Sequence, residues 1–124
     1  MKAAPLPLAF DDGVFPAGCP SRVVLDHITS KWGVLILLAL SEGEQRWSDL
    51  RRRAEGISEK MLAQTLKTLE RDGLVSRNAQ PVIPPRVDYS LTERGYELSA
   101  LLVPLVAWAF ENAEEIVNAA GAGK

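Results

Sequence analysis

The sequence is poor in the residues that build disulfide scaffolds, metal sites and catalytic centres. It has one cysteine, Cys19, and one histidine, His27, in 124 residues. A single thiol cannot close an intramolecular disulfide, and the two residues together are too few for a metal-ligating set. No nucleophile with a base and no convincing pair of catalytic acids accompanies them. We therefore expect no cofactor, no metal and no enzymatic activity.

Long hydrophobic runs are missing as well. The longest fully apolar run, residues 100–110, contains Pro104 and is well short of the ~20 residues that a membrane helix needs. The N-terminus has no continuous apolar segment of the kind found in signal peptides. We therefore expect a cytoplasmic protein without membrane contact.

The composition that remains is that of one ordinary globular domain. Apolar residues make up 47% of the chain and charged residues 24%, which predicts a packed core in a single domain. The net charge of −2 argues against nonspecific coating of nucleic acid. The charge is uneven, because residues 44–94 hold ten Lys or Arg against eight Asp or Glu. This central segment is the net basic part of the chain.

Apolar periodicity predicts three helices in the first half of the chain. They follow a flexible N-terminal arm, residues 1–18, that is rich in proline and glycine. Two helices are expected over residues 19–30 and 32–40. A short third helix is expected over residues 48–54, with Ser48 as its N-cap.

A helix-turn-helix is predicted at the centre of the chain. Gly56 breaks the third helix, and Ser58 has the side chain expected of the N-cap of a helix over residues 58–72. Ile57 and Leu62 can form a hydrophobic staple across this cap. Two helices joined by a short turn with a glycine are typical of a helix-turn-helix. Residues 58–72 are then the recognition helix.

The second half of the chain predicts a β-hairpin and a long helix. Residues 74–80 and 86–91 alternate like strands, and the prolines between them indicate a protruding loop, the wing of a winged helix-turn-helix. A long helix, kinked at Pro104, follows. The expected fold is mainly α with a small β-hairpin, in one domain over residues 19–118 with a flexible tail over residues 119–124.

The predicted recognition helix separates an apolar face from a basic one. At ~100° per residue, its leucines share one arc, and the opposite side carries Lys60, Gln64, Lys67 and Arg71. In the major groove, glutamine pairs with adenine and lysine reaches guanine or phosphate. The free amides at the helix start, with Ser58, suit a phosphate. The alternative is a solvated face without a role in DNA binding.

The wing adds two arginines, Arg77 and Arg86, on its two strands. An arginine at this place can reach a narrow minor groove, where the negative potential is enhanced. Ordinary strand-surface arginines are the alternative. The residues that we assign to DNA contact are Ser48, Ser58, Lys60, Met61, Gln64, Lys67, Arg77 and Arg86.

Several motifs occur in order between Cys19 and Phe110. They read Cys-Pro at 19–20, Lys-Trp at 31–32, Gln-Arg-Trp-Ser-Asp-Leu at 45–50, Gly-Ile-Ser-Glu-Lys-Met-Leu at 56–62, Leu-Glu-Arg-Asp-Gly-Leu-Val at 69–75, Pro-Pro-Arg-Val-Asp-Tyr-Ser-Leu-Thr at 84–92 and Trp at 108. Together they resemble the HxlR family of MarR-type regulators. Trp47 and Asp88 depart from the family pattern, in which Phe and Glu are common at these places.

The resemblance implies a homodimeric winged-helix transcription factor that binds double-stranded DNA and represses or activates a neighbouring operon. We expect a repressor. The alternative is a winged-helix module that binds another protein and does not read DNA.

The last helix gives the homodimer separate support in the sequence. Its apolar residues surround it more fully than one small core requires, and those expected at the dimer contact are Leu98, Leu101, Leu102, Leu105 and Trp108. Two-fold symmetry then predicts a pseudo-palindromic operator. The alternative is that this helix only closes the monomer core.

Cys19 is the candidate sensor residue. It precedes Pro20 at a helix start, where the dipole and unpaired amides favour a thiolate. The family resemblance implies sensing of a small electrophile or oxidant, because in several relatives the cysteine at this position is a redox or quinone sensor. The alternative is an inert packing cysteine.

Overall fold

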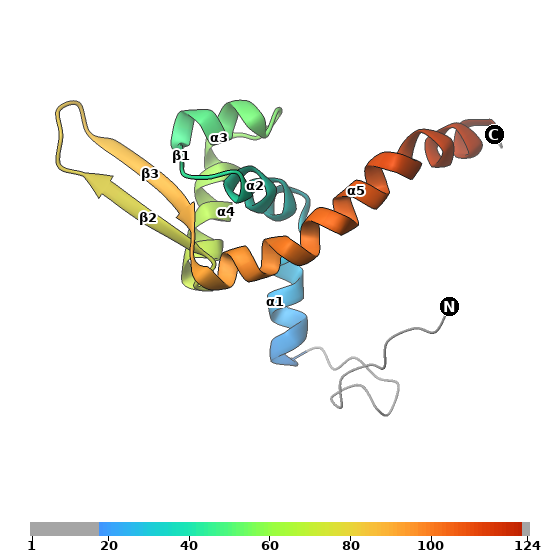
Figure 1. Ribbon diagram of the computed structural model, residues 1–124, viewed down its shortest axis with the longest axis horizontal. Helices are drawn as coiled ribbons and strands as arrows, with labels where there is room; N and C mark the ends of the chain where they lie inside the picture. The colour runs from blue at the N-terminus through green and yellow to red at the C-terminus, as the bar shows by residue number, and fades with distance from the viewer. Residues whose placement is uncertain (1–17, 123–124) are drawn as a thin grey trace.

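The computed structural model of the chain describes residues 18–122 and shows a winged helix-turn-helix domain (Figure 1). The helices of this range are α1 (Pro20–Ile28), α2 (Lys31–Ser41), α3 (Trp47–Arg53), α4 (Glu59–Arg71) and α5 (Glu93–Ala122). Its strands are β1 (Gln45–Arg46), β2 (Val75–Gln80) and β3 (Arg86–Leu91). The predicted mainly α fold with a small hairpin is confirmed. The predicted arm lies outside the described residues, except for Gly18.

The helix α2 is the centre of the core. Ser30 caps it, because its side-chain oxygen accepts a hydrogen bond from the Gly33 backbone N–H at 3.1 Å. Ile36, Leu37 and Leu40 of α2 have no exposed surface. The helical interpretation of this nearly all-apolar segment is therefore confirmed. Within residues 18–122 no single helix is long and apolar enough to span a membrane; α1 and α2 reach that threshold only as a pair, bent by 71°.

The prediction that Ser48 caps α3 is wrong. The helix begins at Trp47, and the N-cap position belongs to Arg46, whose side chain makes no capping hydrogen bond. Residues 45 and 46 form β1, an unpredicted strand that pairs with β3 and places Arg46 opposite Asp88. The extended backbone therefore ends at Arg46, and the helix follows directly. Two residues are too short for the alternation that reveals a strand in a sequence.

The predicted start of α4 is confirmed. Ser58 is its N-cap, and the Met61 backbone N–H donates to the Ser58 hydroxyl oxygen at 3.0 Å. Gly56 precedes it with φ +92°, a backbone conformation that favours glycine. Ile57 and Leu62 are both buried, as a hydrophobic staple requires.

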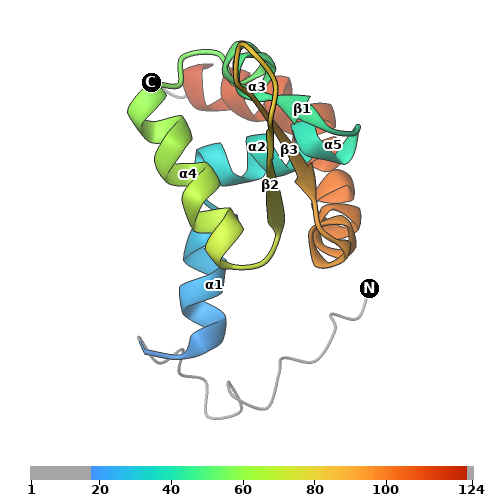
Figure 2. The ribbon, with the colours of Figure 1, turned by 90° about the vertical axis from the view of Figure 1, so that its left-hand side faces the viewer.

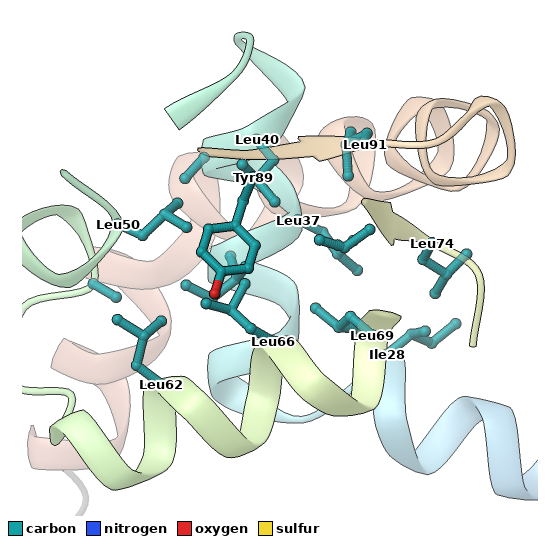
Figure 3. Packing of buried hydrophobic residues seen from close by; sticks show 14 of the residues in the cluster. Ile28, Leu37, Leu40, Leu50, Leu62, Leu66, Leu69, Leu74, Tyr89 and Leu91 are labelled. Carbon is teal, nitrogen blue, oxygen red and sulfur yellow. The ribbon is translucent and has the colours of Figure 1, made fainter. Parts of the chain in front are cut away.

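The apolar face of α4 packs under α2 and the sheet. Leu62, Leu66 and Leu69 are at most 2% exposed, and Figure 3 shows Tyr89 reaching from β3 toward Leu62 and Leu66. Each fully buried side chain of this size stabilises the folded state by about 1.5–3 kcal/mol. This packing orients α4 so that its opposite face points to solvent.

The sheet has the order β1-β3-β2 and is antiparallel throughout. Its outer hairpin, β2 and β3, pairs Val75 with Leu91 at the base and Gln80 with Arg86 near the tip. The buried residues lie at the base, whereas residues 77–86 are exposed. The predicted wing is therefore confirmed as a hairpin that extends away from the core (Figure 1).

The start of α5 is in tight contact with the base of the sheet. Gly95 lies so close to Leu74, the residue before β2, that a Cβ atom on it would be 2.1 Å from the Leu74 carbonyl oxygen. The first part of α5 runs along the domain, and the rest projects away from it (Figure 1). Pro104 lies inside the helix, which continues to Ala122. The expected end near residue 118 is thus too early, and residues 119–122 are helical.

Candidate nucleic-acid interface

The helix α4 and the wing lie side by side on one side of the molecule. Figure 2 shows both facing the viewer, with α5 behind them, and Figure 1 shows the same separation from the side. The sheet and α4 are also in direct contact through β2. A winged helix-turn-helix presents this pair of elements to DNA.

Four polar side chains form a straight line along the outer face of α4, which we call the α4 stripe. At ~100° per residue, they lie within about 60° of one another, opposite Leu62. All four are exposed: Lys60, Gln64, Lys67 and Arg71. The stripe is as long as three turns of the helix. It therefore has the size and the accessibility needed to lie in a major groove.

The cations of the α4 stripe differ from those of α3 in their pairing. Each arginine of α3 forms an ion pair with an acid: Arg51 with Glu59, Arg52 with Asp49 and Arg53 with Glu42. Among the described residues, no ion pair involves Lys60, Lys67 or Arg71. The positive charge of the α4 stripe is therefore not neutralised by an ion pair among residues 18–122, whereas that of the three consecutive arginines of α3 is.

The two predicted wing arginines lie on opposite faces of the hairpin. Arg77 is paired in register with Tyr89, and Arg86 with Gln80. Since neighbours in register share a face and successive residues alternate, Arg77 is on the Tyr89 side and Arg86 is on the Asp88 side. The Arg86 Nε donates to Asp88 Oδ1 at 3.0 Å, whereas Arg77 is exposed and has no ion pair among residues 18–122. The two therefore cannot act as one cluster.

Asp88 is a buried carboxylate on the same face of the hairpin as Arg86. It is 3% exposed, and it accepts hydrogen bonds from Arg86 and from Gln80 Nε2 at 3.3 Å. The guanidinium offsets the cost of burying the carboxylate. Asp88 therefore holds Arg86 on the strand instead of leaving it free to extend from the tip.

Arg46 is a candidate contact residue that the sequence analysis missed. It is exposed, it forms no ion pair among the described residues, and it lines a hollow of about 470 Å³ between the start of α3 and the wing. Ser48 and Arg86 line the same hollow, so polar side chains from the start of α3 and from the distant wing lie around it. A net basic segment was the only sequence signal, and it did not distinguish Arg46 from its neighbours.

Ser58 and Met61 have more limited access to DNA. Ser58 is exposed, but its oxygen already accepts the capping hydrogen bond. Met61 is 39% exposed and, with Gln64, lines a hollow of about 190 Å³ between α4 and α1. His27 also lines this hollow, and its Nδ1 lies 2.7 Å from Asp72 Oδ2. This contact ties α1 to the C-terminal end of α4.

The predicted dimer residues fall into two groups. Leu102 is 5% exposed and belongs to the monomer core, and Leu98 is half-buried against that core. Leu102 therefore has little surface left for a dimer contact, because its side chain is already covered within the chain. The others are exposed: Leu101 at 72%, Leu105 at 56% and Trp108 at 57%.

Cys19 is the N-cap residue of α1 and is half-buried. The backbone amide of Ser21 lowers the pKa of the Cys19 thiol below its ordinary value, because an amide N–H stabilises a nearby thiolate. Among the described residues, no group of three or more His, Cys, Asp or Glu side chains could hold a metal ion.

The chain matches known regulators over most of its length. The family model of the HxlR-like helix-turn-helix matches residues 27–117. The HTH-type transcriptional regulator YtfH of Escherichia coli (strain K12) is 52% identical over 107 residues, which cover 86% of this chain and 85% of that protein. The expected resemblance to the HxlR family is therefore confirmed.

Solved structures agree with this match. The transcriptional regulator ytfH from Salmonella typhimurium superposes with a TM-score of 0.82 at 49% identity, covering 87% of this chain and 96% of that one. The redox regulator HypR in its oxidized form has a TM-score of 0.71 at 35% identity, covering 76% and 97%. The chain is a DNA-binding transcriptional regulator of the HxlR-like helix-turn-helix family.

Proposed function

We propose that this regulator is a repressor that binds a pseudo-palindromic DNA site as a homodimer, with the α4 stripe in the major groove. The observation that carries the proposal is the pairing pattern of the cations. Lys60, Lys67 and Arg71 are exposed and unpaired among the described residues, whereas the arginines of α3 are paired with acids. Unpaired cations on one helix face can replace the counterions of the DNA backbone.

Within the α4 stripe, Gln64 is the best candidate for reading a base. Its amide can donate to and accept from an adenine edge, and no hydrogen bond within the described residues engages its side chain. Lys60 and Lys67 flank it along the helix and can reach guanine or phosphates. Base readout and backbone contact therefore come from neighbouring turns of the same helix.

The apolar surface outside the core supports the proposed homodimer. The exposed side chains Leu101, Leu105 and Trp108 lie along α5, and Val24 and Leu25 are exposed on α1. An apolar surface of this extent indicates an association site. A partner copy packed on these two helices would place two α4 helices on one side of the duplex, about 34–36 Å apart.

The test is DNA binding by the full chain to duplexes that it selects from a random pool. We expect a pseudo-palindromic consensus, and we expect Lys60→Ala combined with Gln64→Ala to abolish selective binding. Arg53→Gln is the matched control, because Arg53 is paired with Glu42 on α3. Unchanged binding by the double variant would contradict the assignment, and no binding by the intact chain would favour the protein-interaction alternative.

Repression is tested separately, with a reporter gene behind the selected site. We expect lower reporter output when the chain is expressed, because a dimer bound over a promoter excludes the polymerase. Higher output would identify an activator.

A regulator of this kind works where the DNA is, which in bacteria and archaea is the cytoplasm.

We infer that Cys19 is the residue through which an oxidant or a small electrophile acts. Its lowered thiol pKa and its position at the N-cap of α1, one turn before the exposed Val23, support this role. HypR, to which the chain is similar, is a redox regulator. We expect diamide to weaken DNA binding by the intact chain and not by Cys19→Ser. Equal responses would exclude Cys19 as the sensor.

A further inference from the structure

We propose that the tip of the wing is an apolar wedge that enters the DNA minor groove beside the α4 site and bends the duplex there, with Ile83 at its point. This inference rests on the proposed function, because it requires α4 in the adjacent major groove. It differs from the arginine contact expected from the sequence.

The tip consists entirely of apolar residues. Between Gln80 and Arg86 the chain reads Pro-Val-Ile-Pro-Pro. Ile83 is 100% exposed and Val82 is 50% exposed. The three prolines have a locked φ and no N–H donor. The tip is therefore stiff, and its backbone has few N–H groups that need a hydrogen-bond partner. Figure 1 shows the tip at the end of the hairpin, far from the core that could otherwise bury Ile83.

The surface beside the tip favours an anionic partner. The hollow between the tip and the start of α3 is lined by the tip residues 82–85 together with Arg46, Trp47, Ser48, Arg86 and Val87, and no Asp or Glu lines it. The nearest carboxylate along the strand, Asp88, is buried and held by Arg86. An apolar point flanked by cations matches a DNA minor groove, whose walls carry the apolar faces of the sugars and whose rims carry phosphates.

The geometry of the wing fits this assignment. The hairpin is narrow, and its tip is a single turn of chain that lies near the start of α3, on the side of the molecule that α4 also faces (Figure 2). A minor groove is only about 6 Å wide, which admits a hairpin tip but not a helix. Because Asp88 holds Arg86 back from the tip, Ile83 enters first, while Arg46 and Arg86 remain at the rim to contact phosphates.

Insertion of an apolar side chain has a physical consequence for the DNA. Isoleucine and proline wedges unstack a base step and kink the duplex toward the major groove. Pyrimidine–purine steps are the easiest to unstack. Each half of the operator should therefore contain a pyrimidine–purine step at the place that the wing reaches. The step is needed because it unstacks easily, and no side chain there reads a base.

The test uses the full chain and a duplex that it selects from a random pool, with a fluorescence donor and acceptor at the two ends. The intact chain should shorten the end-to-end distance. Ile83→Ser should bind about tenfold more weakly and bend the duplex less, because it loses apolar contact. Ile83→Leu should bind and bend nearly like the intact chain. The Ile83 side chain is fully exposed, so circular dichroism should show the same fold for all three.

Arg46→Gln separates the wedge from the charge contacts. It should reduce the slope of log affinity against log salt by about one, whereas Ile83→Ser should leave this slope unchanged. Moving the pyrimidine–purine step away from the position that the wing reaches should weaken binding by the intact chain and not by Ile83→Ser.

Two results would overturn the inference while leaving the proposed function intact. One is an intact chain that selects and binds a duplex, with Ile83→Ser binding and bending it equally well. The other is loss of regulation in cells by Ile83→Ser without any change in DNA binding, which would place the tip against a protein. If the intact chain selects no duplex at all, the proposed function fails and the inference fails with it.

Discussion

In the proposed complex with DNA, single residues of the α4 stripe have separable roles. Gln64 is the candidate for reading a base edge, whereas Lys67, whose charged group suits either guanine or phosphate, is expected to contact the backbone. The difference is measurable, because a lost base contact changes the preferred sequence and a lost phosphate contact changes the salt dependence.

We predict that Gln64→Ala relaxes the preference at one base pair of each half-site, with a loss of about 1–3 kcal/mol in discrimination. Lys67→Ala should instead weaken binding to all sequences and lower the salt slope by about one. Competition binding with single-base variants of the selected duplex, repeated over a series of salt concentrations, measures both effects. A uniform loss from Gln64→Ala would assign it to the backbone.

Cys19 has a pH-dependent reactivity that follows from its environment. The Ser21 amide lowers the thiol pKa, so at a given pH more of Cys19 is thiolate than in an unfolded chain. The rate of alkylation by iodoacetamide should rise with pH through this pKa and level off above it. We predict a midpoint at lower pH in the folded chain than in the same chain unfolded in urea. Equal midpoints would contradict the prediction.

At the scale of elements, the junction between the sheet and α5 depends on one missing side chain. A Cβ on Gly95 would meet the Leu74 carbonyl oxygen at 2.1 Å and Leu91 side-chain atoms at 3.1 Å. The Gly95 N–H also donates to Thr92 Oγ1 at 3.1 Å. Thr92 in turn donates its backbone N–H to the Leu74 carbonyl oxygen at 3.0 Å, so a shift of α5 away from Leu74 would break this bond.

We predict that Gly95→Ala lowers the free energy of unfolding by about 1–3 kcal/mol, because the backbone must shift to remove the overlap. Gly121→Ala is the matched control in the same helix, since no atom lies within 4 Å of its added Cβ. It should leave stability unchanged or raise it slightly. Urea denaturation measures both, and equal effects would show that the close approach is not limiting.

At the scale of the whole molecule, two adjacent leucines of α5 have different neighbours. Leu102 is 5% exposed inside the monomer, whereas Leu101 is 72% exposed. In the proposed dimer, Leu101 is covered by the partner and Leu102 by its own chain.

We predict that Leu102→Ala lowers the free energy of unfolding by about 2–5 kcal/mol, because it leaves a cavity in the core. Leu101→Ala should keep the folded monomer but raise the dimer dissociation constant about tenfold, as loss of an interface contact does. Analytical ultracentrifugation and urea denaturation together distinguish the two. A Leu101→Ala variant that dimerises as tightly as the intact chain would place the interface elsewhere.

Local signals were sufficient for most elements of this protein. Ser58 has a side chain that caps a helix and Gly56 a backbone that permits the preceding turn, so the start of α4 was predictable. The leucine spacing of α4 also predicted which face is buried. Such features depend on residues within a few positions of one another, and a sequence displays them directly.

The tertiary structure decided what depends on distant partners. It paired β1 with β3, which moved the start of α3 to Trp47 and placed Arg46 beside the wing. It buried Leu102 and exposed Leu101, and it placed Arg77 and Arg86 on opposite faces of the hairpin. It also showed that the three arginines of α3 are paired with acids, whereas the cations of α4, Lys60, Lys67 and Arg71, have no ion pair among the described residues.

The sequence by itself therefore determined the family, the order of all the elements except β1, and the outward face of the recognition helix, because these follow from local periodicity and from motifs in order. Only the tertiary structure decided which cations remain free for DNA, which apolar residues remain for a partner, and that the wing ends in an isoleucine instead of an arginine. These depend on strand register and on contacts between residues far apart in the chain, which no local pattern encodes.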